Sequence, residues 1–205
     1  MNREYRRMAW GMLFVLIDFR INGFDIVPDW IGYAMISFGC AQLVAGGNKP
    51  FRLAQYTALL LFCFAVVNVF TGTFVVWNSN QDIRPEFGFP MLFNGASGVL
   101  DLVLVFLLCA GIYKQAMAVG SEEFAQSAQR CGYIYLIVNG AIDALLPFTF
   151  NLSDNFTLIV IMLSFVSLLT KILVTLLLFR ASKPFYMPPP SEDSAHAGAI
   201  IDKRV

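Results

Sequence analysis

Ionisable side chains lie inside the most apolar stretches of this sequence. Five of them stand among apolar neighbours: Asp18, Arg20, Asp101, Asp143 and Lys171. A charge at the centre of a bilayer raises the insertion free energy by about 2.5–3.5 kcal/mol, so each of these groups needs a partner or water inside the protein. Residues of this kind form ion and proton pathways, and they also act as interhelical contacts that fix packing. Both chemistries are therefore open for this chain.

The polar residues of each apolar stretch recur at intervals of three or four. This spacing puts them on one face of an α-helix. Asn94, Ser97 and Asp101 share one such face, and Asn139 and Asp143 share another. The remaining stripes are Asp18, Asn22 and Asp25; Asn68 and Thr71; and Ser164, Ser167, Lys171 and Thr175. We therefore predict that the stripes face a common interior.

Opposite charges at similar depth should pair in that interior. The pair that we expect first is Lys171 with Asp101, and Arg20 should pair with Asp143 or with its own neighbour Asp18. Breaking a buried pair leaves an uncompensated charge, which is strongly unfavourable. The predicted intramembrane polar core consists of Asp18, Arg20, Asn22, Asn68, Asn94, Asp101, Asn139, Asp143 and Lys171.

The elements that must carry this core are apolar stretches of membrane-spanning length. Of the 205 residues, 58% are hydrophobic and 14% are charged, whereas about a quarter of the residues of soluble proteins are charged. A helix of about 20 apolar residues crosses the hydrocarbon core. The predicted helices are residues 8–27, 30–46, 53–77, 91–113, 131–150 and 156–179. The fold class is thus an all-α polytopic membrane helix bundle with six transmembrane helices in one domain, residues 1–183.

The distribution of positive charge predicts the orientation in the membrane. Lys and Arg residues flank the predicted helices at 3–7, 49–52, 114–130 and 180–183, and they alternate with segments that hold mostly acids. Basic loops face the cytoplasm, so we expect both termini there. Residues 114–130 read equally well as a short interfacial helix or as a solvated connector. Residues 184–205 are rich in Pro, Ser and acids, and this pattern predicts a disordered cytoplasmic tail.

The sequence offers little for catalysis or cofactor chemistry. The one histidine, His196, lies in the predicted tail, and the four cysteines are far apart, without a Cys-x-x-Cys pair. Buried apolar packing is the favoured role for these cysteines. The predicted helices contain no nucleophile with a matching base and no zinc-ligand set, so we expect no enzyme activity, catalytic residue, metal or cofactor. Because no basic stripe lies outside the membrane flanks, we also expect no nucleic-acid binding.

The segment from Asn22 to Tyr33 resembles a known signature. It reads Asn-Gly-Phe-Asp-Ile-Val-Pro-Asp-Trp-Ile-Gly-Tyr and is similar to an Asp-Ile-Leu-Pro-Asp-Phe-Ile-Gly-Tyr run that joins the first two spans in a group of small uncharacterised bacterial integral membrane proteins. Val27 replaces the leucine and Trp30 the phenylalanine. The resemblance implies a multi-pass protein of the bacterial plasma membrane and no particular substrate.

Two functions follow from these patterns. The first is a small permease-like or ion- or proton-translocating protein that uses the charged core. The alternative is a non-catalytic membrane subunit or regulator whose buried charges only fix helix packing. The expected partner in either case is the lipid bilayer, and a homo-oligomer or a larger membrane complex stays open. A small ion or small molecule is the expected substrate of the first function.

Overall fold

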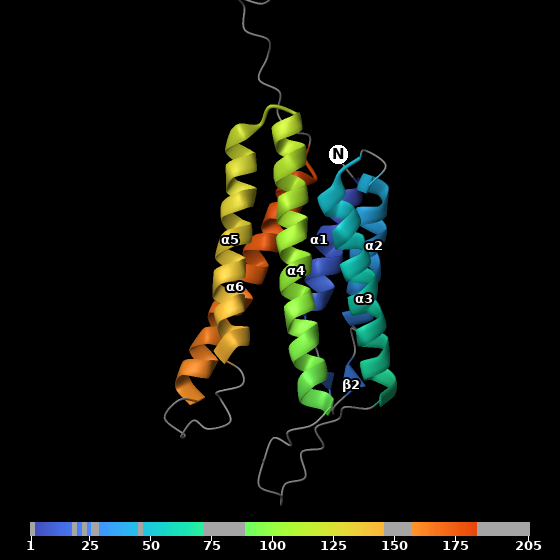
Figure 1. Cartoon of the computed structure of the whole chain (residues 1–205), viewed down its shortest axis with the longest axis vertical. Helices are drawn as coiled ribbons and strands as arrows, with labels where there is room; N and C mark the ends of the chain where they lie inside the picture. The colour runs from blue at the N-terminus through green and yellow to red at the C-terminus, as the bar shows by residue number, and fades with distance from the viewer. Residues whose placement is uncertain are drawn as a thin grey trace, which may run out of the picture.

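The computed structural model of this chain describes residues 3–17, 20–21, 24–25, 29–44, 47–71, 89–145 and 157–183. Within these ranges the fold is helical apart from one small hairpin, so the predicted all-α class is confirmed. The helices are α1 (Arg3–Leu16), α2 (Asp29–Val44), α3 (Lys49–Thr71), α4 (Phe89–Ala118), α5 (Glu122–Leu145) and α6 (Thr157–Ala181) (Figure 1). In the hairpin, β1 (Arg20–Ile21) pairs antiparallel with β2 (Phe24–Asp25). The predicted tail, residues 184–205, lies outside the described residues.

The six helices form a closed ring. Each helix contacts the next one in sequence, and α6 packs against α1 to complete the circuit. Figure 1 shows α5 and α6 on one side of α4, with α1, α2 and α3 on the other. Side chains that point into such a ring are shielded from the surroundings, while those on its outer face are available to lipid. The ring therefore has an interior that can shield polar side chains.

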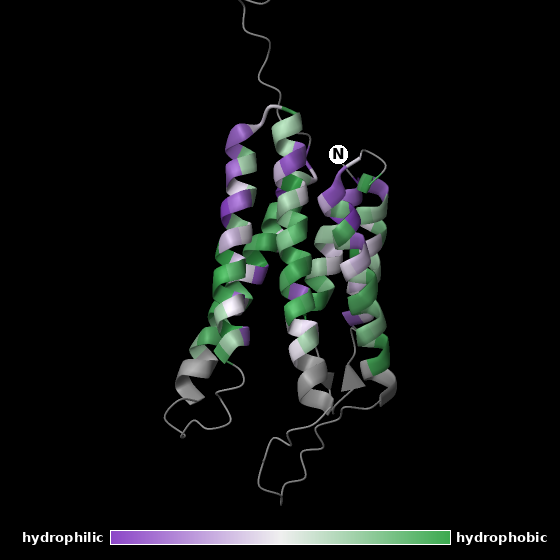
Figure 2. Ribbon diagram, viewed as in Figure 1, coloured by the Kyte–Doolittle hydropathy of each residue, from purple (hydrophilic) through white to green (hydrophobic). Residues whose placement is uncertain are grey.

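Among the described residues, three helices are long and apolar enough to cross a membrane. Their qualifying segments are Lys49–Val67 in α3, Gly95–Ala118 in α4 and Met162–Ala181 in α6. Figure 2 shows the apolar middle of the bundle and the more polar end that carries the α4–α5 turn. Helices α1 and α2 have 14 and 16 residues, fewer than the roughly 20 that a spanning helix needs. The length and composition of α3, α4 and α6 thus support a membrane protein.

The predicted first helix, residues 8–27, is wrong. Helix α1 ends at Leu16, and the chain then forms the β1–β2 hairpin, in which Arg20 pairs with Asp25 and Ile21 with Phe24. The sequence between the strands is Asn22-Gly23, the dipeptide most typical of two-residue hairpin turns. The helical stripe expected to include Asp25 therefore does not form.

The connection between α4 and α5 is also shorter than predicted. Neither an interfacial helix nor a long connector forms over residues 114–130, because α4 continues to Ala118 and α5 begins at Glu122. Gly120 has a φ of 78°; its N–H bonds to the Met117 carbonyl (3.1 Å), and the Ser121 N–H bonds to the Ala116 carbonyl (2.9 Å). This pair of bonds is the Schellman arrangement that ends a helix at glycine. It reverses the chain directly from α4 into α5.

Bulky apolar side chains fill the ring between the middle of the bundle and this turn. Tyr5 of α1 packs edge-on against Phe51 of α3, with ring centroids 6.0 Å apart, and its hydroxyl donates to Gln115 Oε1 of α4 at 2.8 Å. Other fully buried side chains here are Met8, Met12, Ile36, Leu104, Leu108, Ile112 and Leu178. We call this set, with Tyr5 and Phe51, the apolar plug. It fills one end of the interior.

Candidate functional site

An ion pair lies next to the apolar plug. Lys171 Nζ of α6 is 3.0 Å from Asp101 Oδ2 of α4, and the exposed fractions of the two side chains are 27% and 12%. Tyr135 of α5 donates its hydroxyl to the same carboxylate oxygen at 2.9 Å. The predicted pairing of Lys171 with Asp101 is confirmed, and three helices meet at this carboxylate.

The second oxygen of Asp101 is left without a donor. Asp101 as a whole residue is 8% exposed, and its Oδ1 is buried with no hydrogen-bond partner among the described residues. An ionised carboxylate can accept about four hydrogen bonds, and a buried acceptor that makes none is destabilising by about 1–3 kcal/mol. Asp101 Oδ1 can therefore accept a hydrogen bond from one more donor.

Asp143 of α5 brings a second carboxylate close to the first. A Cβ at Gly98 of α4 would lie 3.2 Å from Asp143 Oδ1, so the absence of a side chain at Gly98 makes space for this carboxylate. Gly98 and Asp101 are three residues apart and share one face of α4. No ion pair to Asp143 occurs within the described part of the chain. The predicted partner Arg20 lies in β1, and its side chain is outside the described residues.

Asn139 of α5 serves as a bridge to α6. Its Nδ2 donates to Thr170 Oγ1 at 3.0 Å and to the Tyr135 carbonyl at 3.1 Å. Its Oδ1 accepts a hydrogen bond from Ser167 Oγ. Asn139 is 8% exposed, and both ends of its amide have partners. This arrangement is that of an interhelical contact that fixes the relative position of α5 and α6.

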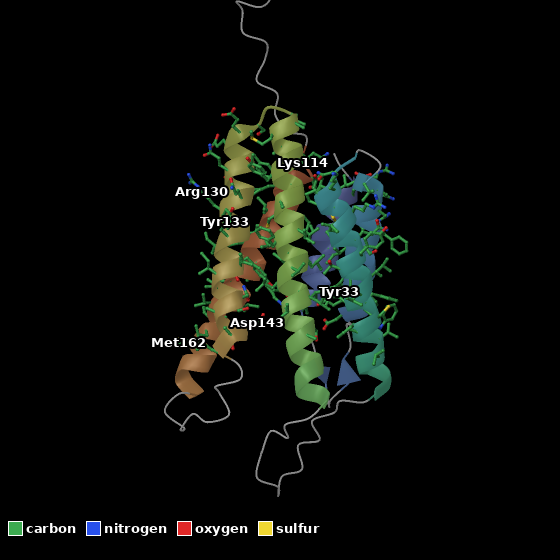
Figure 3. All side chains as sticks on the ribbon, in the orientation of Figure 1. Tyr33, Lys114, Arg130, Tyr133, Asp143 and Met162 are labelled. Carbon is green, nitrogen blue, oxygen red and sulfur yellow. The ribbon has the colours of Figure 1, made fainter. Side chains whose placement is uncertain are left out.

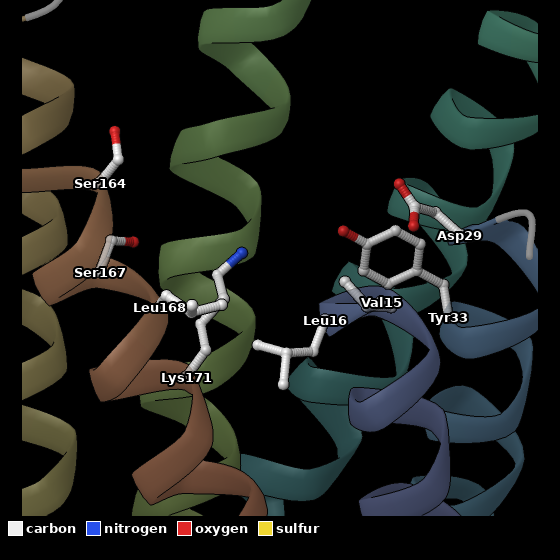
Figure 4. Close-up of a pocket in the computed structure, with 8 residues that line it drawn as sticks. All are labelled: Val15, Leu16, Asp29, Tyr33, Ser164, Ser167, Leu168 and Lys171. Atoms are coloured by element: carbon white, nitrogen blue, oxygen red, sulfur yellow. The ribbon is translucent and has the colours of Figure 1, made fainter. Parts of the chain in front are cut away.

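A cavity of about 330 Å³ opens between α1, α2 and α6 beside the ion pair. Its lining residues are Val15, Leu16, Asp29, Tyr33, Ser164, Ser167, Leu168 and Lys171. In Figure 4 the Lys171 side chain extends toward the opposite wall, which Asp29 and Tyr33 form. Figure 3 shows Tyr33 and Asp143 in the half of the bundle away from Lys114 and Arg130. The cavity thus combines a cationic, an anionic and several hydroxyl groups with apolar surface.

Sequence reasoning missed the role of Asp29 and Tyr33. Tyr33 is 8% exposed and lines the cavity, so its side chain faces the interior of the protein. The two residues are four apart at the start of α2, so they share a helix face. This spacing of four residues between an acid and a tyrosine was the sequence pattern that could have indicated a shared site.

The structure brings four of the predicted core residues into one region: Asp101, Asn139, Asp143 and Lys171. Asn68 lies on α3 and Asn94 on α4, but their side chains are not described, and Asp18 and Asn22 lie outside the described residues. Lys171 interacts electrostatically with the carboxylates of Asp29, Asp101 and Asp143. Three acids therefore surround one base in the described part of this region.

Metal binding has no support in the described part of the chain. It contains no group of three His, Cys, Asp or Glu side chains placed to hold a metal ion. The four cysteines are free thiols, of which Cys40 and Cys109 are buried, Cys131 is half-buried and Cys63 is exposed. Packing as buried apolar side chains thus fits Cys40 and Cys109 and is wrong for Cys63.

Comparisons with known proteins give no relative for this chain. No protein-family model, curated protein or solved structure matches it. The resemblance of Asn22–Tyr33 to a bacterial membrane-protein signature therefore stays a prediction. The features of the structure that bear on function are the charged cluster of Asp101, Asp143 and Lys171 and the cavity beside it.

Proposed function

We propose that this protein is a small multi-pass permease-like protein of the bacterial plasma membrane that translocates a small ion or a proton through its ring of helices. The observation that carries the proposal is the cavity of about 330 Å³ that Lys171 lines while it pairs with Asp101. Ionisable groups at the depth of membrane-spanning helices are functional-site candidates by default. In this proposal the protein is not an enzyme.

The alternative, a subunit or regulator whose charges only fix packing, accounts for part of the site. The Asn139 bridge and the Lys171–Asp101 pair both fit that role. A packing role predicts that every buried polar group is satisfied by another. Asp101 Oδ1 is buried and lacks a donor among the described residues, and the half-buried Asp143 has no ion pair among them. The unsatisfied Asp101 oxygen favours a site that exchanges a ligand or a proton.

The proposed topology has six crossings and both termini in the cytoplasm. The basic residues near the plug end of the described helices are Arg3, Arg6, Arg7, Lys49, Arg52, Lys114, Arg130, Arg180 and Lys183, and positive charge of this kind faces the cytoplasm. Helices α1 and α2 are short, and residues 17–28 link them. Interrupted helices that line a cavity are typical of the substrate sites of transporters.

The apolar plug gives the proposed transporter a closed and an open side. The plug fills the ring toward the end that this proposed topology puts in the cytoplasm, so in this proposal the charged cluster exchanges ions with the opposite side. Transport then requires that the plug opens and that the other side closes. Separation of Lys171 from Asp101 is a step that could accompany this change, because the pair joins α6 to α4.

Charge movement in reconstituted membranes tests the proposal. The full-length protein in liposomes on a solid support should give transient currents after jumps in H⁺, Na⁺ or K⁺ concentration. Asp143→Asn should reduce the currents by at least about tenfold, because it removes a titratable group from the pathway. The control Glu123→Gln, at the exposed start of α5, should leave them unchanged.

Two results would favour the regulator instead. One is the absence of current from folded wild-type protein with all three ions. The other is loss of folded protein in Asp143→Asn, which would show that this carboxylate holds the bundle together.

A further inference from the structure

The charged cluster of Asp101, Asp143 and Lys171 already contains an ammonium group, that of the Lys171 side chain. The end of the Lys171 side chain is chemically a primary alkylammonium, and its Nζ lies 3.0 Å from Asp101 Oδ2. The same carboxylate has a second oxygen, Oδ1, that is buried without a donor in the described structure. An ammonium group has three N–H donors and no acceptor. Either oxygen of the Asp101 carboxylate can therefore accept a hydrogen bond from an ammonium group.

The charge balance at the ion pair also favours a cation. Lys171 interacts with the carboxylates of Asp101 and Asp143, so these three described groups carry more negative than positive charge when ionised. Excess charge away from water is unfavourable unless it is paired. A ligand with one positive charge would reduce the imbalance, whereas an anion would increase it.

The remaining lining fits the alkyl part and the N–H groups of such a ligand. Val15, Leu16 and Leu168 provide apolar surface, and the hydroxyl oxygens of Tyr33 and Ser164 provide hydrogen-bond acceptors. Ser167 belongs to the same wall, and it uses its hydroxyl hydrogen on Asn139, which leaves its oxygen free to accept. A volume of about 330 Å³ lies near the lower limit of small-molecule pockets, about 300 Å³. The ligand must therefore be small.

We infer that the cavity between α1, α2 and α6 binds a small primary alkylammonium cation, which competes with the Lys171 ammonium for the Asp101 carboxylate. The inference deepens the proposed transport function, because it names the class of ion that occupies the site. Lys171 is then a tethered competitor that holds the site when no ligand is bound. When the ligand displaces it, the contact between α6 and α4 is released.

Thermal unfolding of the purified full-length protein in detergent tests this site. Methylammonium chloride should raise the unfolding temperature with a saturable dose dependence, because a ligand that binds the native state stabilises it. Sodium chloride and tetramethylammonium chloride at the same ionic strength should not, since the first has no alkyl group and the second has no N–H donor.

Two variants make the competition visible. Lys171→Ala removes the competitor, so the apparent Kd for propylammonium should fall by at least about tenfold, which is about 1.4 kcal/mol. Added propylammonium should also bring the unfolding temperature of Lys171→Ala back toward that of the wild type. Lys183→Ala, which removes an exposed lysine at the end of α6, is the matched control and should bind as the wild type does.

If Lys171→Ala does not fold, Leu168→Trp provides a second test of the cavity. It fills the cavity without a change in charge and should abolish the methylammonium effect. The inference is overturned if methylammonium and sodium affect the wild type equally, or if Leu168→Trp keeps the full effect. Currents without amine binding would refute this inference alone, while amine binding without currents after jumps in H⁺, Na⁺, K⁺ or methylammonium concentration would refute the transport function alone.

Discussion

At the scale of single residues, Asp101 Oδ2 receives two strong donors. Lys171 supplies the charge, and Tyr135 supplies a neutral hydroxyl from a different helix. Hydrogen bonds to charged groups contribute about 1.5–3 kcal/mol each. Tyr135 is 1% exposed, so no solvent can take its place. The tyrosine should therefore hold the Asp101 carboxylate toward α5.

Tyr135→Phe tests that role. The change keeps the ring and removes the O–H, so the free energy of unfolding should fall by about 1.5–3 kcal/mol, measured by denaturant or thermal unfolding in detergent. Tyr133→Phe is the matched control, because Tyr133 is 48% exposed on the same helix and should change stability by less than about 0.5 kcal/mol. Equal effects of the two changes would show that the Tyr135 hydroxyl contributes nothing specific.

Part of this site could be predicted from helix periodicity. Asp101 and Lys171 stood out as opposite charges in long apolar stretches at similar depth, and their pairing followed from the need to neutralise buried charge. Asp29 and Tyr33 did not stand out, because a carboxylate at a helix start and a tyrosine near a membrane end both have ordinary explanations. Their place at the cavity depends on where α2 begins, which local sequence patterns do not reveal.

At the scale of elements, α1 and α2 are held together by close backbone approach. A Cβ on Gly32 of α2 would lie 2.6 Å from the Gly11 carbonyl oxygen of α1 and 2.5 Å from Val15 Cγ2. In the same way, a Cβ added at Gly11 would lie 2.7 Å from the Gly32 carbonyl oxygen. Small residues at an interface allow such contact. This packing fixes Asp29 and Tyr33 relative to the wall that Val15 and Leu16 form.

Gly32→Ala should force α1 and α2 apart. The added methyl group would overlap backbone, so we expect a loss of about 1–3 kcal/mol in the free energy of unfolding. Gly95→Ala in α4 is the control: a Cβ there meets nothing within 4 Å, and alanine should be neutral or stabilise the helix by up to about 1 kcal/mol. A Gly32→Ala protein as stable as the wild type would contradict this account of the α1–α2 contact.

The limits of prediction at this scale lie in helix ends. The existence of helices α2 to α6 was predicted because long apolar runs mark them, but the fifth predicted helix, residues 131–150, begins nine residues after the observed start of α5 at Glu122. The first predicted helix was wrong because an apolar run and a hairpin can share residues, and Asn22 was assigned to a helical stripe although Asn-Gly is a hairpin-turn signal. The extension of α4 and α5 through residues 114–130 depended on the Gly120 cap, which favours a turn over a longer connector.

At the scale of the whole molecule, the helices form a ring that joins the first helix to the last. The contact of α6 with α1 leaves no trace in local sequence patterns, because it depends on how all six helices pack. The ring explains why a cavity exists at all: its walls come from α1, α2 and α6, while the residue paired with Lys171 comes from α4. Periodicity predicted which faces are polar, and only the packed ring shows which faces meet.

The orientation of the ring in the membrane is the remaining prediction. The charge distribution predicts that the α4–α5 turn faces the cytoplasm, so a cysteine introduced as Gln126→Cys, at an exposed position early in α5, should react with a membrane-impermeant maleimide only after intact bacterial cells are opened. Gln81→Cys, in the segment between α3 and α4 that this orientation predicts to be external, should react in intact cells. The unsubstituted protein gives the background from Cys63 and Cys131. Labelling of Gln126→Cys in intact cells would reverse the orientation, and the plug would then close the outer side of the site.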